Sequence, residues 1–376
     1  MACEQLTRLG DVIELEDVKR EPISSRDRKD RKGSYPYYGA QGIVDYLDDY
    51  TYEGDYLLVA EDGENLRSRK NPIANAASGK FRVNNHAHVI AESEKCNLVF
   101  LRHLLNMTDI SAYVTGSTQP KLSQSNLCAM KLPLPSMAEQ NAIANVLSLF
   151  DRKIELNNQL NDYLEQLVDG KFQELFGGLN FNATLSDVAE ITMGQSPAGS
   201  SYNEEGAGII FYQGRGEFGW RFPKRRLYTT EPKRLACEGD VLMSVRAPVG
   251  DLNVAFENCC IGRGLAAIHS ETPSFALYLM RFLKPQLEAY NGEGTVFGSI
   301  NGKALKSLEV ALPSHNEVMQ FESFAAPIDA LIRSNENETR KLNNLRNYLI
   351  PKLMSGEIDV SKVDLTQLTN NHLADY

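Results

Sequence analysis

The chain has 376 residues, which is enough for two domains of ordinary size or for two copies of one domain. Hydrophobic residues make up 42% and charged residues 23%, and no run approaches the roughly 18 apolar residues of a membrane span, so the composition is that of a soluble globular protein. The net charge of −10 argues mildly against nucleic-acid binding, but acidic residues concentrate in 137–178 and after 356, which leaves room for a basic face elsewhere.

The N-terminus and the cysteines indicate the compartment. The first residues include acidic side chains and no apolar signal segment, so we expect a cytoplasmic location. Six cysteines without a C-x-x-C pair are too few for a disulfide framework in a chain of this length, and they lack the spacing of a zinc site. We therefore expect neither disulfides nor a bound metal.

In chain order, residues 1–135 come first, with turn signals such as Gly39-Ala40-Gln41-Gly42 between short apolar runs. This pattern predicts many short strands, interrupted by a short helix near 98–107. Residues 179–313 show the same kind of pattern, with a short helix near 274–288. Both segments are therefore predicted to be mixed α/β domains.

The segments that follow these two domains, 136–178 and 314–356, match each other when the sequence is offset by 178 positions. The gapless match begins before these segments, at Gly116 over Gly294, and extends over about 60 residues. It places Pro135-Ser136 over Pro313-Ser314, which argues against chance similarity between two helices. The chain is thus an internal repeat of domain, helix, domain and helix. A polar, acidic tail at 357–376 follows.

The repeated segments are predicted to be long helices. Each begins with a capping box, Ser136-x-x-Glu139 in the first and Ser314-x-x-Glu317 in the second. Apolar side chains then recur every three or four residues, which is typical of a coiled-coil seam. The seam positions include Ile154, Asn157 and Leu164, and their counterparts Ile332, Asn335 and Leu342. An Asn within a seam costs stability but fixes the register of the two helices.

These patterns predict an α+β fold. Two similar mixed α/β domains are separated by two long helices that form an antiparallel coiled coil, with a pseudo-two-fold internal repeat. The alternative is that each apolar stripe packs on its own domain. Pro327 lies inside the second seam and is expected to kink that helix or delay its start, and Pro351 is expected to disturb its end.

Several strings resemble a known family. In the first domain they are YYGAQGIVDYLDDY, GDYLLVAEDGENLRSR and GKFRVNNHAHVI; in the second, LSDVAEITMGQSPAGSSYN, FYQGRGEFG and GDVLMSVRAPVGDLNVAFENCCIGRGLAAI. Together with the helix starts LPSMAEQNAI and LPSHNEVMQF, they resemble the specificity subunit of type I restriction–modification enzymes over about residues 5–358. The second helix start departs from the family pattern, since Val318 stands where a Gln is usual.

The resemblance implies two target-recognition domains, each reading one half of a bipartite double-stranded DNA site. It implies that the helices set the spacing between the half-sites and dock two methylation subunits, and that a translocase–nuclease subunit joins for restriction. S-adenosylmethionine, ATP and magnesium are then expected on those partners and no cofactor on this chain. The sequence contains no phosphate-binding loop, nucleophile elbow or H-E-x-x-H pair, so we expect no catalytic site.

The candidate DNA contacts of the second domain begin with a basic stretch at 214–226 that interleaves aromatic residues and glycines. Arg and Gln can read guanine and adenine edges, and Arg and Lys can bind phosphates. From this stretch and its flank we nominate Gln213, Arg215, Trp220, Arg221, Lys224 and Arg225. Arg246, beside Pro and Gly, and Arg263, between two glycines, are added because glycine permits close approach of the backbone. The alternatives are a solvated loop and ion pairs within the domain.

The first domain offers fewer signals. Arg67 and Arg69 follow an acidic turn, and His86 and His88 alternate so that both face one side of a strand. The loop before the helix contains Thr118, Gln119 and Lys121. All seven are candidate DNA contacts; structural roles are the alternative.

Three other readings remain open from the sequence. The chain could be the recognition subunit of a methylation-only or type II complex. It could be a protein–protein scaffold with two similar domains, which predicts no sequence-selective DNA footprint. It could also be an enzyme with an unrecognised pocket, which predicts turnover by the isolated chain.

Overall fold

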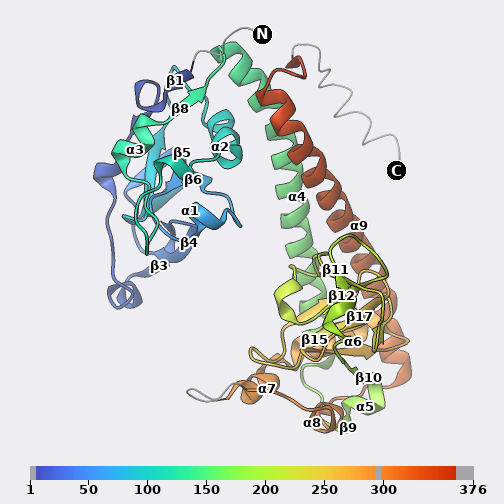
Figure 1. Ribbon diagram of the computed structural model, residues 1–376. Coiled ribbons are helices and arrows are strands. Elements are labelled where there is room, and N and C mark those ends of the chain that lie inside the picture. Colours follow the sequence, from blue (N-terminus) through green and yellow to red (C-terminus); the bar gives the residue numbers. More distant parts are fainter. Residues whose placement is uncertain (1–5, 293–297, 361–376) are drawn as a thin grey trace. The chain divides into compact units, whose positions relative to one another are not determined.

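The computed structural model describes residues 6–292 and 298–360 (Figure 1). Contacts divide the chain into two compact units: unit 1 combines Met1–Leu156 with Thr339–Tyr376, and unit 2 is Asn157–Glu338. The division cuts both long helices, α4 (Met137–Phe176) and α9 (His315–Met354), so each unit contains one domain and half of each helix. Of the predicted tail, residues 361–376 lie outside the described part.

The domain of unit 1 is built on a six-stranded sheet in the order β2-β7-β5-β6-β3-β4. Its strands are β2 (Glu14–Leu15), β3 (Lys32–Gly39), β4 (Gly42–Leu47), β5 (Tyr52–Ala60), β6 (Ala74–Val83) and β7 (Ala87–Ala91). Neighbours are antiparallel except β3 and β6, which run parallel. The other elements are the paired strands β1 (Leu6–Arg8) and β8 (Lys131–Pro133) and the helices α1 (Asn65–Ser68), α2 (Leu98–Met107) and α3 (Gln124–Ala129). The helix α2 packs against β5 and β6.

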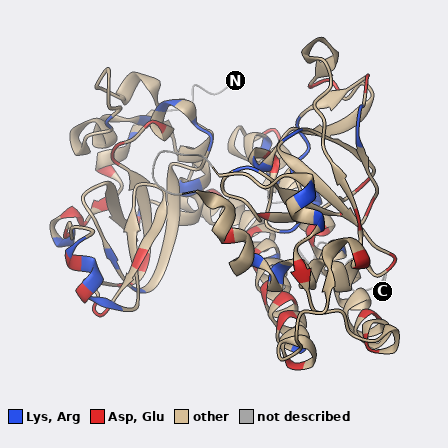
Figure 2. Ribbon diagram, turned by 90° about the horizontal axis from the view of Figure 1, so that it is seen from below, with Lys and Arg blue, Asp and Glu red and all other residues tan. Residues whose placement is uncertain are grey.

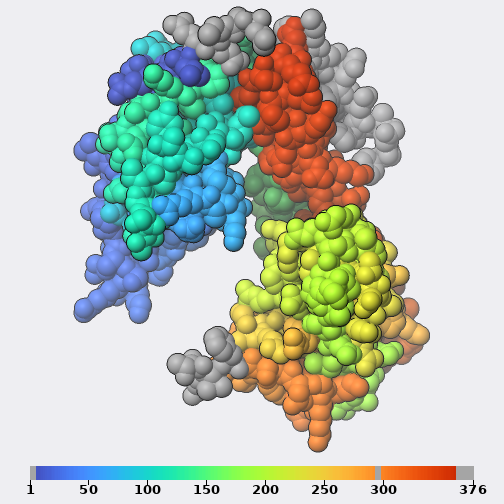
Figure 3. Space-filling model, viewed as in Figure 1, coloured from blue at the N-terminus to red at the C-terminus, as the bar shows by residue number. Residues whose placement is uncertain are grey.

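The domain of unit 2 has two sheets, ordered β10-β18-β15-β16 and β11-β13-β12-β17-β14. The first contains β10 (Glu190–Met193), β15 (Val241–Ser244), β16 (Leu252–Val254) and β18 (Leu265–His269). The second contains β11 (Tyr202–Asn203), β12 (Ile209–Tyr212), β13 (Tyr228–Thr229), β14 (Leu235–Ala236) and β17 (Cys259–Ile261). The remaining elements are β9 (Ala183–Thr184), α5 (Leu185–Val188), α6 (Pro273–Phe282), α7 (Lys284–Glu288), α8 (Gly302–Lys306) and β19 (Glu309–Val310). In Figure 3 this domain runs from yellow-green to orange.

The internal repeat is visible in the strand pairing. In unit 1 the parallel pair is β3 with β6, where Tyr38 lies beside Val83, and in unit 2 it is β12 with β17, where Tyr212 lies beside Ile261. A short antiparallel pair also precedes each long helix in the same way, β1 with β8 and β9 with β19. The two domains are therefore similar in topology, as predicted.

Each half-helix packs both on its own domain and on the other long helix. In unit 1, Leu147 of α4 and Leu342 and Leu353 of α9 share one apolar core with Phe100 of α2. In unit 2, Phe172 and Phe176 of α4 contact Phe321 of α9 and Phe275 of α6. The coiled coil is confirmed, and packing of the helices on the domains accompanies it in both units.

Both predicted capping boxes are present. The Ser136 N–H donates to Glu139 at 3.1 Å, and the Glu139 N–H donates to the Ser136 hydroxyl at 3.4 Å. In α9 the corresponding distances for Ser314 and Glu317 are 2.8 and 3.4 Å. These reciprocal bonds satisfy N–H groups that the first turn leaves without partners and fix where each helix begins.

The polar seam residues pair across the two helices of unit 2. Asn335 Nδ2 donates to Asn161 at 2.8 Å, and Asn157 Nδ2 donates to Glu338 at 2.8 Å. The numbers of each pair add up to nearly the same value, which is the signature of an antiparallel register. Asn157 and Asn335 are equivalent positions in the repeat. They nevertheless have different partners, because these two residues do not face each other in the antiparallel register.

The expectation that Pro327 delays the start of its helix is wrong, while a kink at Pro327 and a disturbed end at Pro351 stay predictions. The helix α9 runs through Pro327 and Pro351 without an interruption, and it begins at His315. Proline removes one hydrogen bond and strains the preceding turn. Phe321 and Ala325, which lie six and two residues before Pro327, are buried in the core of unit 2, and this packing stabilises the helix there.

No helix within residues 6–292 and 298–360 is long and apolar enough to cross a membrane. The five cysteines in those ranges, which exclude Cys3, are free thiols.

Candidate nucleic-acid interface

Four of the nominated residues of unit 2 lie together. Gln213 follows β12, Arg215 lies in the next turn, Arg246 follows β15, and Arg263 lies between β17 and β18. All four line one cavity of about 380 Å³, which we call the arginine cavity. All four side chains are exposed. The structure thus brings together residues from three separate motifs.

Glycines allow these loops to meet. A Cβ added at Gly262 or Gly264 would lie 2.8 or 2.9 Å from the Gln213 carbonyl oxygen, closer than real Cβ atoms come. Backbone bonds hold the same contact, since the Gly262 N–H donates to Tyr212 at 2.8 Å. The two glycines that flank Arg263 are therefore required to place it beside Gln213.

The guanidinium groups of the arginine cavity differ in their partners. Arg215 forms an ion pair of 2.7 Å with Asp251. Within the described residues, neither Arg246 nor Arg263 forms a salt bridge or a side-chain hydrogen bond. Both can therefore donate to a phosphate or to a base edge without breaking an internal bond.

Arg221 is a correction. Its side chain is 4% exposed and bonds Asp329 at 3.0 Å, Glu165 at 3.2 Å and the Tyr278 hydroxyl at 3.1 Å. These partners belong to α9, α4 and α6. Arg221 thus attaches the domain to both helices within unit 2 and is inaccessible to DNA.

The other nominated residues of the basic stretch lie at the surface. Trp220 is 43% exposed and Lys224 is exposed. Arg225 pairs with Glu257 at 2.6 Å. In the view of Figure 2, Lys and Arg positions along the ribbon are interspersed with Asp and Glu positions in both units.

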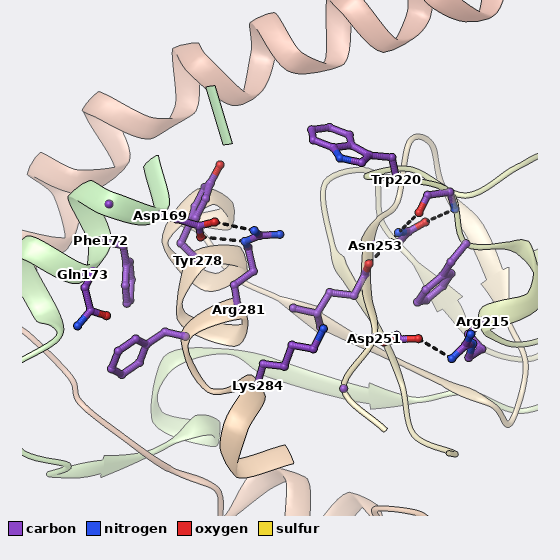
Figure 4. Close-up of a pocket in the computed structure, with 16 residues that line it drawn as sticks. Asp169, Phe172, Gln173, Arg215, Trp220, Asp251, Asn253, Tyr278, Arg281 and Lys284 are labelled. Atoms are coloured by element: carbon purple, nitrogen blue, oxygen red, sulfur yellow. Dashed lines mark hydrogen bonds and ion pairs between the residues drawn. The ribbon is translucent and has the colours of Figure 1, made fainter. Parts of the chain in front are cut away.

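A larger cavity of about 780 Å³ lies beside Trp220 in unit 2 (Figure 4). Its charged groups are mostly paired: Arg281 bonds Asp169 at 2.6 and 2.9 Å, and Arg215 bonds Asp251. Its lining contains neither a histidine nor a serine, threonine or cysteine, so it offers no nucleophile–base pair of the usual kind. It is a polar groove rather than a recognisable active site.

In unit 1, two nominated arginines support neighbouring backbone. Arg67 donates to the carbonyl oxygens of Ser117 (2.8 Å) and Gly116 and thereby holds the loop that presents the exposed Thr118 and Gln119. Arg69 donates to Leu105 and Asn106 at the end of α2, at 3.1 and 2.7 Å. Both guanidinium groups are thus occupied by structural bonds.

The two histidines of unit 1 have different environments. His86 is exposed and lies 2.7 Å from Asp62, so it remains a candidate. His88 is 1% exposed; its ring nitrogens lie 2.7 Å from Asp17 and 2.8 Å from the Leu122 carbonyl oxygen. Both polar atoms of His88 are used inside the domain, so its nomination as a DNA contact is a second correction.

Around His88 the structure gathers a cluster that the sequence did not reveal. Asp17 and Glu61 lie close enough to His88 to share a metal ion, but Arg20 bonds Glu61 at 2.6 Å and Asp17 at 3.2 Å. Lys121 also bonds Glu61, at 3.1 Å. Burial acts to raise the pKa of Asp17, but the hydrogen bonds from His88 and Val89 outweigh it and lower that pKa. The cluster is thus a neutralised ion-pair network.

A second group with donor atoms close together is Cys237, Asp240 and His269 in unit 2. Asp240 accepts from the Cys237 N–H at 2.8 Å and lies 2.7 Å from His269 Nδ1. The hydrogen bond and the charge of Asp240 raise the pKa of His269. His269 lies 29 positions from Asp240 in the sequence, so motif spacing did not indicate this group.

Known proteins resemble this chain in sequence and in fold. The family model described as type I restriction modification DNA specificity domain matches residues 5–166 and 182–347. A protein of Methanocaldococcus jannaschii named as the type I restriction enzyme MjaX specificity subunit is 30% identical over 381 positions, covering 94% of this chain and 84% of that protein. The MjaIX specificity subunit of the same organism is 24% identical, covering 82% and 80%. The crystal structure of the S subunit of a type I restriction–modification system from M. genitalium has a TM-score of 0.61 at 18% identity, covering 93% and 95%.

Proposed function

Since this chain belongs to the family of specificity subunits of type I restriction–modification systems, we propose that each of its units reads one half of a bipartite double-stranded DNA site. The arginine cavity is the observation that supports this most directly. Exposed donors from three loops converge there, and two guanidinium groups have no ion-pair partner among the described residues. Such groups suit both phosphate binding and readout of base edges.

The long helices are proposed to dock two methylation subunits. On α4, Leu160, Tyr163 and Leu167 are 43%, 70% and 54% exposed and follow a spacing of three and four residues, which places them on one helix face. On α9, Leu345 and Tyr348 are 44% and 60% exposed. Large apolar side chains left uncovered on a helix face suit the apolar face of a partner helix.

The same helices are proposed to set the spacing between the half-sites. Their capping boxes fix where each helix begins, and the paired Asn side chains fix the register of α4 against α9. A pair of helices with defined starts and a defined register has a defined length.

The chemistry is proposed to reside on partners in the cytoplasm. In the cavity beside Trp220 the charged groups are mostly paired and the lining offers no nucleophile–base pair of the usual kind, and the arginine cavity presents cations rather than such a pair. S-adenosylmethionine is assigned to the methylation subunits, and ATP and magnesium to a translocase–nuclease subunit. The chain itself is then a non-catalytic specificity subunit.

The test is co-expression with the methylation subunits of the same system, followed by mapping of methylated adenines on host DNA. We expect one split motif, with two short defined halves and a fixed undefined gap. A stable complex that methylates no defined motif would favour a protein–protein scaffold instead.

A further inference from the structure

The loops around the arginine cavity have counterparts in unit 1, identified by backbone hydrogen bonds. In unit 2 these bonds run from Gly262 N to Tyr212 O (2.8 Å), Val245 N to Gly264 O (3.0 Å) and Ile300 N to Val245 O (3.1 Å). In unit 1 they run from Asn84 N to Tyr38 O (3.0 Å), Glu61 N to His86 O (2.8 Å) and Leu122 N to Glu61 O (2.7 Å). The same three bonds connect the same strands in the same order.

These bonds define which residues are equivalent. Arg263 lies between Gly262 and Gly264, so its counterpart is Asn85, between Asn84 and His86. Arg246 follows Val245, so its counterpart is Asp62, which follows Glu61. Isolated bridges agree with this assignment, because Arg246 pairs with Ser299 as Asp62 pairs with Lys121, and Ser299 lies 178 positions after Lys121.

The chemistry at the equivalent positions differs. In unit 2 both positions carry arginine, exposed and without a salt bridge within the described residues. In unit 1, Asn85 is exposed and presents an amide, while Asp62 is held by His86 at 2.7 Å. Lys121 beside them is engaged with Glu61 at 3.1 Å. The loops of unit 2 are therefore cationic, and those of unit 1 are internally neutralised and offer an uncharged side chain.

An arginine and an asparagine at equivalent positions match different bases of DNA. The guanidinium fork matches the N7 and O6 acceptors of guanine, and the Asn amide matches the N7 acceptor and N6 donor of adenine. We propose that Arg263 reads a guanine in the half-site bound by unit 2, and that Asn85 reads an adenine in the half-site bound by unit 1. This rests on the proposed function above and assigns a base class and a residue to each half-site.

Both residues are placed to act as base contacts rather than as structural elements. Arg263 lies between two glycines in a turn whose position is fixed by its neighbours' backbone, and its side chain has no partner to lose. Asn85 lies in the turn between β6 and β7, where Asn84 accepts from the His86 N–H at 2.8 Å and fixes the turn. Substitution of either side chain therefore leaves the described hydrogen bonds intact.

The test uses the complex with its methylation subunits and maps methylated adenines for the unmodified chain, Arg263→Asn and Asn85→Arg. Arg263→Asn is expected to reduce discrimination in favour of one guanine roughly tenfold to a hundredfold, in one half-site only. Asn85→Arg is expected to reduce discrimination in favour of one adenine, in the other half-site only. Lys306→Asn, which removes another exposed charge of unit 2 from α8, should leave both half-sites unchanged.

A conservative variant separates base reading from charge. Arg263→Lys keeps the charge and loses the fork, so it should lose guanine discrimination while retaining the salt dependence of DNA binding. A split motif that stays the same in Arg263→Asn and Asn85→Arg would overturn the inference and leave the proposed function standing. Absence of any split motif from the unmodified complex would instead overturn the proposed function.

Discussion

Asp151 and Asp329 occupy equivalent positions of α4 and α9. Asp151 is contacted by the sixth residue of α2, and Asp329 by the sixth residue of α6. His103 Nε2 in α2 lies 3.0 Å from Asp151, and the Tyr278 hydroxyl in α6 donates to Asp329 at 3.1 Å. Burial raises the pKa of Tyr278, so its hydroxyl remains a donor. Each domain is thus attached to a long helix through an equivalent carboxylate, with a different aromatic partner.

Asp151→Asn should destabilise unit 1 by about 2 kcal/mol at neutral pH. Burial acts to raise the pKa of Asp151, but His103, Arg102 and Arg346 outweigh it and lower the pKa from 3.8 to about 2. A lowered carboxyl pKa stabilises the folded state at pH values above the unfolded-state pKa of 3.8. This contribution, about 1.4 kcal/mol per unit of pKa shift, is lost as the pH falls toward 2.

The measurement is hydrogen-exchange protection of α4 amides in the full chain at pH 7 and in steps from 4 down to 2. The difference between Asp151→Asn and the unmodified chain should narrow over that acidic range. Asp162→Asn, an exposed carboxylate on the same helix, is the control and should show no such change. A difference that does not vary with pH would contradict the electrostatic explanation.

Arg221→Ala and Arg215→Ala should have opposite profiles. Arg221→Ala leaves the part-buried Asp329 without its cation and Glu165 with Arg281 alone, and should cost roughly 3 kcal/mol of unit 2 stability. Arg215→Ala removes an exposed ion pair, so thermal unfolding should change by less than about 1 kcal/mol, while affinity for the DNA half-site falls. Thermal unfolding and DNA-binding titrations of both variants decide this; normal stability of Arg221→Ala would refute its structural assignment.

The effects on stability of substituting Asn161 and Asn335, which bond each other across the seam, should be strongly coupled. Asn335→Leu alone leaves Asn161 with one fewer partner and should cost roughly 1–3 kcal/mol. The double variant Asn161→Leu with Asn335→Leu replaces both polar groups by apolar ones and should be close to neutral or stabilising. A double-mutant cycle from denaturant unfolding measures the coupling; simple additivity of the two changes would mean that the hydrogen bond contributes nothing.

The spacing proposal predicts the length of the methylated site. Ile154 and Leu342 are seam positions whose numbers fit the antiparallel register, so seven residues inserted after each would preserve the heptad pattern. Seven residues add about 10 Å of helix, or roughly three base pairs of DNA. Methylated-adenine mapping should show a longer gap between unchanged half-sites. Altered half-sites with an unchanged gap would contradict the role of the helices as a spacer.

Local features of the fold could be predicted from the sequence where neighbouring residues decide the outcome. The capping box of Ser136 and Glu139 spans one helical turn, and the repeat places Ser314 and Glu317 in the same arrangement. The glycines beside Arg263 likewise indicated a close backbone contact. The delayed start expected at Pro327 did not occur, because burial of Phe321 and Ala325 in the core of unit 2 outweighs the helix-breaking preference of proline.

The candidate site was harder to predict, because distant partners decide which side chains remain available. Arg215 and Arg221 lie six residues apart in one basic stretch, yet Arg221 is buried by Asp329, which is 108 positions away. His86 and His88 differ for the same reason, since Asp17 and Leu122 enclose only the second. Asn85 was missed because it lies outside any basic stretch, and only the repeated backbone bonds identify it as the counterpart of Arg263.

The division of the long helices also determines the order in which the protein can be completed during synthesis. Unit 2 is one continuous segment, Asn157–Glu338, whereas unit 1 needs residues from both ends of the chain. Leu342 and Leu353 belong to the core that also contains Phe100 and Leu147. The domain that leaves the ribosome first therefore obtains the last part of its core only after the other domain has been made, and a nascent chain released before Leu342 would carry a complete unit 2 beside an unfinished unit 1.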